Sequence, residues 1–323
     1  MSATDARIDL ERVEGLWFAD ADLILRAENS IFRVYSGILC AHSSFFRGML
    51  PLPQPTQAEA GEETLDGRII VQLQDKATET EAFLRAIFDS SFFEPPPSPV
   101  DFSVVIAILR LAHKFDVQYL FRRALSHLDS LYPVDLENLL RRSDSNEHRD
   151  HVRYQHGDVT VDMIALRAAY QVKALWLIPV ICYSIAAESD FMNAAAGVLE
   201  THEIQMCLSA QAKLVRTVVS SYRFMSMLPD AACESTLCHE IVVEGQGVLH
   251  SQRALSQDMN PLSYSVFHFL PRKLCPTCLG VGEGIYKETQ EEFWSDLPRL
   301  FGSPSWEDLK EMRGEVMGEG DAT

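Results

Sequence analysis

The chain has little positive charge for its length. Its 323 residues include 28 lysines and arginines against 46 aspartates and glutamates, so the formal charge at pH 7 is −18. A surface with this excess of carboxylates repels the phosphate backbone of nucleic acids. The composition therefore argues against a general nucleic-acid-binding role, and we expect no nucleic-acid partner.

The sequence also lacks the segments that direct a protein into or across a membrane. Residues 1–14 are polar and charged, so no secretory signal is visible. The longest apolar run, residues 174–183, is too short to span a bilayer and is interrupted by Pro179, which indicates a buried helix. We therefore expect no membrane association and a location in the cytoplasm, the nucleus or both.

Cysteine is scarce, and its number is odd. Seven cysteines in a chain long enough to bury a core fit a reducing compartment, with free thiols or a metal site, better than a disulfide framework. Common catalytic motifs are missing as well: the sequence has no Gly-x-Ser-x-Gly, no His-Glu-x-x-His and no Walker A motif. Since nothing nominates a catalytic residue, we expect that the protein is not an enzyme.

What the sequence does contain is a pattern of short strands and helices over residues 16–133. Residues 23–27 and 32–35 have strand-like patterns, and the short polar turn between them predicts a hairpin. An Asp-Gly turn precedes a third strand at residues 68–73. Apolar residues at helical spacing predict helices in the rest of this stretch. The mixture predicts an α+β domain with a small sheet and several helices.

Composition divides the rest of the chain. After the first domain the pattern is mostly helical, with a charge-rich interruption. The expected divisions are a polar tail at 1–15, the α+β domain at 16–133, a linker or long loop at 134–160, a helical region at 161–230, a Cys-bearing helical segment at 231–312 and a disordered tail at 313–323.

Four of the seven cysteines form two close pairs near the end of the chain. Cys233 and Cys238 are five residues apart, and Cys275 and Cys278 form a Cys-x-x-Cys pair that a glycine follows two residues later. Two thiolate pairs can satisfy tetrahedral zinc, which prefers soft ligands. The spacing predicts a structural zinc site, with no other cofactor required. Buried structural thiols are the other interpretation, and a redox pair is a third one for the Cys-x-x-Cys pair.

Several segments carry the pattern of a known family. They are residues 32–39, 45–50, 83–89, 92–97, 109–117, 175–179, 274–278 and 293–298. Through them, residues 22–133 resemble a BTB/POZ domain, and most of the chain is similar to a large group of basidiomycete fungal BTB proteins. The resemblance implies a protein that binds other proteins and performs no chemistry.

The resemblance also implies a more specific role. It suggests an adaptor or scaffold that brings a client to a cullin-type ubiquitin ligase, with a nuclear transcriptional co-regulator as the alternative. The expected partner-binding residues follow one early helix: Phe45, Phe46, Met49, Leu50 and Leu52. Relatives that dock cullins often have a hydrophobic-x-Glu motif just after this helix, whereas residues 50–54 of this chain contain no glutamate.

A homodimer is a further expectation from the resemblance, because a pair of BTB domains can bury apolar surface across a two-fold axis. Leu16, Trp17 and Phe18 stand at the start of the domain, where an N-terminal element could contribute to such a dimer. The other interpretation is that these three side chains cover the core of their own domain.

Overall fold

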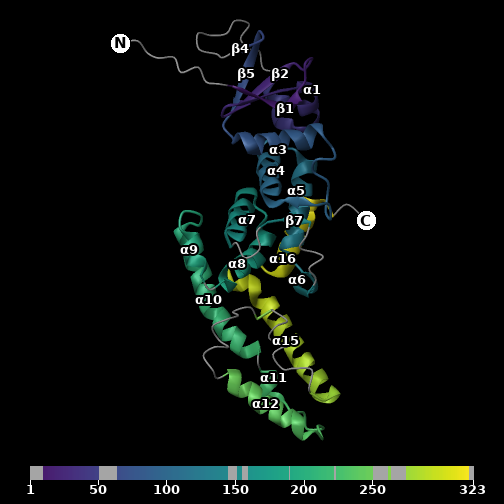
Figure 1. The fold of residues 1–323 in the computed structure, drawn as a ribbon, viewed down its shortest axis with the longest axis vertical. Coiled ribbons are helices and arrows are strands. Elements are labelled where there is room, and N and C mark those ends of the chain that lie inside the picture. The colour runs from purple at the N-terminus through teal and green to yellow at the C-terminus, as the bar shows by residue number, and fades with distance from the viewer. Residues whose placement is uncertain are drawn as a thin grey trace, which may run out of the picture. The chain divides into compact units, whose positions relative to one another are not determined.

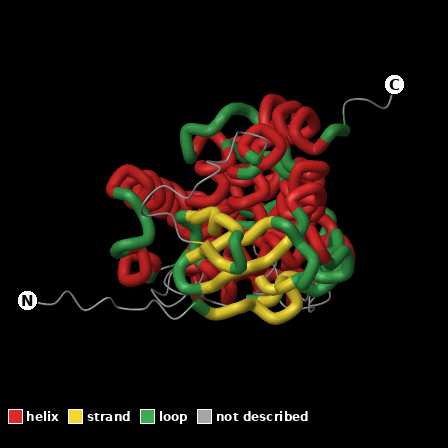
Figure 2. Tube along the Cα trace, turned by 90° about the horizontal axis from the view of Figure 1, so that it is seen from above, coloured by secondary structure: helices red, strands yellow, loops and turns green. Residues whose placement is uncertain are grey.

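The computed structural model describes residues 10–50, 64–144, 151–154, 159–188, 190–221, 223–249, 261–262 and 274–319. The chain divides into two compact units. The first comprises Met1–Leu128 with His151–Arg153, and the second comprises Asp129–Asp150 with Tyr154–Thr323. The expected class, an α+β domain followed by a mostly helical region, is confirmed (Figures 1 and 2).

The described part of the first unit contains a five-stranded sheet with the strand order β1-β3-β2-β5-β4. Its strands are β1 (Glu11–Trp17), β2 (Leu23–Ala27), β3 (Ser30–Val34), β4 (Thr64–Leu65) and β5 (Arg68–Leu73). Strands β2 and β3 form the predicted antiparallel hairpin. Asp66 and Gly67 connect β4 to β5 with φ angles of 53° and 72°, the left-handed conformation that a tight hairpin turn requires. Strand β2 lies inside the sheet, and all of its residues are buried.

Strand β1 begins inside the stretch expected to be a polar tail. It starts at Glu11 and pairs in parallel with β3, with a register irregularity between Arg12 and Trp17. The Arg85 guanidinium also donates a hydrogen bond to the Glu14 carbonyl (3.1 Å). The predicted boundary at residue 15 is therefore wrong. Only Leu16 of this strand is fully buried, so no alternation of apolar residues marks the strand in the sequence.

Helices cover the sheet and complete the core of the first unit. They are α1 (Ser36–His42), α2 (Ser44–Met49), α3 (Ala77–Phe88), α4 (Phe102–Lys114) and the greater part of α5 (Gln118–Leu131). Figure 1 shows α3 next to the sheet, with α4 on its other side. Ser43 connects two of these layers, because its hydroxyl accepts from the Phe46 N–H at the start of α2 and donates to the Phe115 carbonyl.

The second unit is helical in its described residues. Its elements are α6 (Leu136–Asp144), α7 (Val159–Val172), the 3-10 turn η2 (Leu175–Leu177), α8 (Ile178–Ala187), α9 (Phe191–Ala195), α10 (Thr201–Ser221), α11 (Phe224–Met227), α12 (Thr236–Leu249), α15 (Pro276–Leu300) and α16 (Trp306–Met317). The apolar run at 174–183 is buried, as expected, apart from the half-buried Leu175. In the described part of the chain, none of the helices combines the length and the apolar character needed to cross a membrane.

Two predicted divisions differ from the structure. The expected linker at 134–160 contains α6, and its β7 (Val152–Arg153) pairs in parallel with β6 (Val100–Asp101) in the first unit. The expected tail at 313–323 is helical up to Met317, and Gly318 ends the helix with a φ angle of 77°. The charge-rich composition of 134–160 suggested a loop, but among the described residues this stretch forms a helix and a strand.

His127 predicts a pH dependence for the first unit. It is fully buried in α5, where its Nε2–H donates to the Glu94 carbonyl (2.9 Å) and its ring contacts Phe93. Burial lowers the pKa of His127 to about 4, from an ordinary value of about 6.5. Above pH 6.5 both the folded and the unfolded chain have a neutral His127. Between pH 6.5 and 4 the unfolded chain gains a proton that the folded chain does not, so stability falls.

We expect this histidine to remove about 3 kcal/mol of stability between pH 6.5 and 4, at about 1.4 kcal/mol per pKa unit. Hydrogen exchange of β2 and α4 across this pH range measures it. The His127→Phe variant is expected to lose this part of the pH dependence, and His113→Gln, at an exposed histidine of α4, is expected to keep it. Identical pH profiles for His127→Phe and the unmodified chain would contradict the assignment.

Candidate partner-binding surface and metal centre

Two adjacent phenylalanines of α2 have opposite surroundings. Phe46 is fully buried, and its ring lies 5.0 Å from the ring of Phe115. Phe45 is 43% exposed and rests with one side on the same ring, at 5.3 Å. The prediction that Phe46 contacts a partner is therefore wrong, because its side chain fills the core. Phe45 is the aromatic ring that this helix presents to the outside.

The other expected contact residues are less exposed or lie outside the described part of the chain. Met49 and Leu50 at the end of α2 are half-buried. Leu52 lies outside the described residues. For Met49, Leu50 and Leu52, partner binding stays a prediction.

Three further exposed side chains lie on the neighbouring helices α1 and α5, and sequence reasoning did not find them. Ile38 and His42 are exposed on α1, one helical turn apart, and Tyr119 at the start of α5 is 37% exposed. The rings of His42 and Tyr119 are 5.2 Å apart. We call Ile38, His42, Phe45 and Tyr119 the aromatic surface. No pattern in the sequence separated these exposed side chains from the buried Leu39 on the same short helix.

The helices that carry this surface are fixed to each other by polar contacts. Arg47 of α2 donates from its Nε to the Cys40 carbonyl of α1 (2.9 Å). The Ser44 hydroxyl at the start of α2 donates to the Asp116 carboxylate, just before α5. That bond lowers the pKa of Asp116. The surface is therefore built on helices whose ends are held in place.

The expected dimer residues contact their own domain. Leu16 is 1% exposed, so it is not available to a second copy. Trp17 is half-buried beneath the Arg12 guanidinium, which lies 4.5 Å from the ring centroid. Phe18 packs against Tyr35, at 5.3 Å between the ring centroids. The structure corrects the assignment for Leu16, and a dimer through Trp17 and Phe18 stays a prediction.

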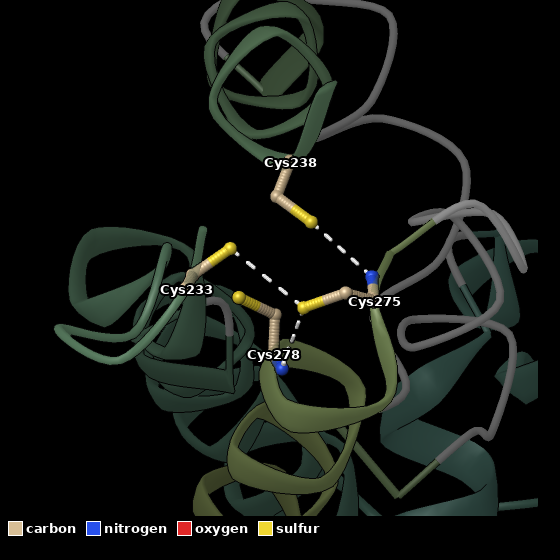
Figure 3. A group of neighbouring side chains, drawn as sticks. All are labelled: Cys233, Cys238, Cys275 and Cys278. Atoms are coloured by element: carbon tan, nitrogen blue, oxygen red, sulfur yellow. Dashed lines mark hydrogen bonds between the residues drawn. The ribbon is translucent and has the colours of Figure 1, made fainter. Parts of the chain in front are cut away.

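The four cysteines singled out by their spacing lie together in the second unit (Figure 3). Cys233 lies in the turn between α11 and α12, and Cys238 is in the first turn of α12. Cys275 is the N-cap of α15, and Cys278 is in the first turn of that helix. All four Sγ atoms lie within 4.8 Å of one another. In the part of the chain that the structure describes, this is the group of residues suited to hold a metal ion.

Backbone amides point at the sulfur atoms. The Asp230 N–H donates to Sγ of Cys278 (3.4 Å), the Cys275 N–H to Sγ of Cys238 (3.2 Å), and the Cys278 N–H to Sγ of Cys275 (3.5 Å). The last bond lowers the pKa of Cys275 to about 7, whereas desolvation raises the pKa of Cys278 to about 12. The two members of the Cys-x-x-Cys pair therefore differ strongly in acidity.

The remaining three cysteines are free thiols outside this group. Cys182 and Cys207 are fully buried in the second unit, and desolvation raises the pKa of Cys182 well above its ordinary value. Cys40 is half-buried in α1. These three cysteines lie outside the cluster, so their substitution is a control for substitutions of the four clustered cysteines.

Comparison with known proteins identifies the first unit. Residues 18–131 match the family model described as BTB/POZ domain. Neither the curated proteins nor the solved structures contain a significant match. Similarity to the basidiomycete group stays a prediction. The sheet, the helices around it and the family match agree, and the chain therefore carries a BTB/POZ domain over residues 18–131.

Proposed function

We propose that this protein is an adaptor whose BTB/POZ domain binds another protein through the aromatic surface. BTB/POZ domains are protein-interaction modules and are generally not enzymes. The observation that carries the proposal is Phe45, a large ring that is 43% exposed on a helix otherwise anchored in the core by Phe46. Exposed aromatic rings on rigid elements are typical centres of binding energy in protein interfaces.

The partner that we propose is the scaffold of a cullin-type ubiquitin ligase. The family resemblance is what supports it. The second unit has its own buried core and would then be free to hold the client. The acidic character of the chain supports contacts with protein and not with nucleic acid.

The test is affinity capture of the full chain from a host extract, with Phe45→Asp as the variant. We expect the main partner to be recovered at least about 30-fold less well, which corresponds to a hot-spot loss of about 2 kcal/mol. Phe92→Asp is the matched control, because Phe92 is also exposed in the first unit (36%) but lies outside the aromatic surface. Unchanged recovery with Phe45→Asp would refute the proposed surface.

The identity of the captured proteins separates the two levels of the proposal. A stoichiometric cullin that is lost in Phe45→Asp and kept in Phe92→Asp would support the ubiquitin-ligase adaptor. Another partner with the same dependence on Phe45 would keep the adaptor and reject the cullin, and nuclear regulatory proteins among the captured set would favour the co-regulator. Phe46→Ala is not a useful test of binding, since emptying a buried ring site costs about 3–5 kcal/mol of stability.

A further inference from the structure

We propose that Cys233, Cys238, Cys275 and Cys278 bind one zinc ion, which serves as a structural clip in the second unit. The inference is independent of the proposed adaptor role, because it concerns other residues in another unit. It rests on three observations: the positions of the sulfur atoms, the backbone donors around them and the size of the local core.

The positions of the sulfur atoms suit a tetrahedral ion. With Zn–S bonds of about 2.3 Å, tetrahedral geometry places the sulfur atoms about 3.8 Å apart. Sγ of Cys233 lies 3.7 Å from Sγ of Cys275, and the full set lies within 4.8 Å. Movements of less than about 1 Å would therefore complete the site. A disulfide needs about 2.05 Å, which is much shorter than this contact.

The backbone around Cys238, Cys275 and Cys278 suits thiolates better than neutral thiols, whereas the Cys233 thiol donates to the Ser235 carbonyl. Three of the four sulfur atoms accept a backbone N–H, at 3.2–3.5 Å. A neutral thiol is a weak acceptor, whereas a metal-bound thiolate is charged and needs such donors to fix its orientation. Helix α15 also begins at this point, and the positive end of its dipole faces the cluster. A tetrathiolate zinc site has a net charge of −2, which these groups would partly balance.

The local core is small for the segments that it holds. Its buried members are Phe224, Met225, Leu228, Cys238, Ile241, Val242, Leu274, Cys278 and Tyr286. Small cores of this kind commonly need a metal or a disulfide to be stable. One ion bound by all four cysteines would join the turn before α12 to the start of α15, which lies about forty residues later in the chain. An ion at this position would therefore stabilise the packing of α12 against the start of α15.

The ligand set also defines the chemistry. Four thiolates fill the coordination shell of zinc and leave no position for water or substrate, so the site is structural and not catalytic. Soft thiolate ligands in a tetrahedral set favour zinc or iron over magnesium, calcium or manganese. The occupant that we infer is zinc, and iron is a distinguishable outcome of the measurement.

The experiment is metal analysis of the full chain, purified under reducing conditions without chelator. We expect about one zinc per chain. Titration with a mercurial reagent, followed with a chromogenic zinc indicator, is expected to release the zinc as four thiols react. Replacement of zinc by cobalt(II) is expected to give the strong visible absorption of a tetrahedral ion and the near-ultraviolet bands of thiolate ligation. These measurements use the unmodified chain, so they do not depend on whether a variant folds.

Variants then assign the ligands. Cys278→Ser and Cys238→Ser are expected to lose the zinc, and Cys40→Ser, at a half-buried cysteine outside the cluster, is expected to keep it. The proposal would be overturned by purified protein with no zinc and four reactive thiols in the cluster, or by zinc that Cys278→Ser still binds. Iron in place of zinc would overturn the choice of metal. Loss of two thiols with no metal would show a disulfide and reject the clip.

Discussion

Removal of zinc from the reduced protein is expected to unfold the region formed by α11, α12 and the first turns of α15, while the BTB/POZ domain stays folded. A structural zinc ion contributes on the order of 10 kcal/mol to the folding of a small domain, which is comparable with the whole stability of such a domain. The buried residues around the four cysteines cannot replace a contribution of that size.

Hydrogen exchange measures this effect locally. With a strong zinc chelator and a reductant, amides of α12 and of residues 276–286 are expected to lose nearly all protection from exchange. Amides of α4 are expected to keep theirs, because α4 belongs to the core of the first unit. Addition of zinc after chelation is expected to restore protection, and addition of magnesium is not, since thiolates prefer the softer ion.

Retained protection in α12 after removal of the metal would contradict the structural role of zinc. If α12 keeps its protection after the metal has been removed, the four thiols are packed into a core that is stable by itself, and the clip has no structural role. Loss of protection in α4 and α12 together would show that the chelator acts on the whole protein and not through the four cysteines. The Cys40→Ser variant is expected to respond to the chelator as the unmodified chain does.

Short sequence patterns predicted the elements whose paired residues are close together in the sequence. The β2–β3 hairpin follows from two strand-like runs around a short turn, and the β4–β5 turn follows from an Asp-Gly pair that adopts positive φ angles. Strand β1 could not be found in this way. Its pairing with β3 joins residues about twenty positions apart, and its mostly exposed side chains leave no periodic pattern.

The N-terminus of α3 also depends on a contact between residues far apart in the sequence, which the local pattern did not predict. A Thr-x-x-Glu pattern at residues 78–81 suggests a capping box, but α3 begins one residue before Thr78, and its N-cap, Lys76, makes no side-chain capping bond. The Ala77 N–H is instead satisfied by the carboxylate of Glu28 (2.8 Å), which comes from the β2–β3 turn. A distant side chain replaced the local cap, and no pattern within the helix could indicate it.

The candidate sites were predictable to different degrees. Spacing alone selected the four cysteines that the fold brings together, because Cys-x-x-Cys at a helix start places two sulfur atoms on one side. The distinction between Phe45 and Phe46 could not be predicted. Both are apolar and adjacent on a helix of six residues, and both rings contact Phe115, so the burial of Phe46 depends on tertiary packing that the local sequence does not show.

Asp129→Ala is expected to destabilise the second unit by about 3–5 kcal/mol, the usual cost of removing one partner from a buried ion pair. Asp129 accepts a hydrogen bond from the Trp176 indole N–H (2.8 Å) and one from Nε of Arg313 (2.7 Å). Its side chain is 13% exposed and that of Arg313 is 24% exposed, and Trp176 is buried. Burial raises the pKa of Asp129 despite the nearby guanidinium, so the charge is held at a cost.

The desolvation cost of Asp129 determines how the single and double variants are expected to differ. Desolvation costs the carboxylate of Asp129 more free energy than its interactions with Arg313 and Trp176 return, so the ion pair adds little net stability. Removing one partner nevertheless destabilises the unit, because the other partners then remain buried without their interaction. Among the described residues, removal of Asp129 leaves the indole N–H of Trp176 in the core without its acceptor and leaves Arg313 with Glu319 as its remaining partner. The double variant Asp129→Ala with Arg313→Ala is therefore expected to cost less than the sum of the two single variants, by about 1–3 kcal/mol.

Asp135→Ala is the matched control, because Asp135 pairs with Lys310 on the same helix, α16, and both side chains are 48% exposed. An exposed pair of this kind contributes about 0–1 kcal/mol. Protection from hydrogen exchange in α8, a largely buried helix of the second unit, is expected to fall several hundred-fold or more in Asp129→Ala and less than about fivefold in Asp135→Ala. Equal effects of the two variants would show that α16 is held by its apolar contacts and that the carboxylate of Asp129 is dispensable.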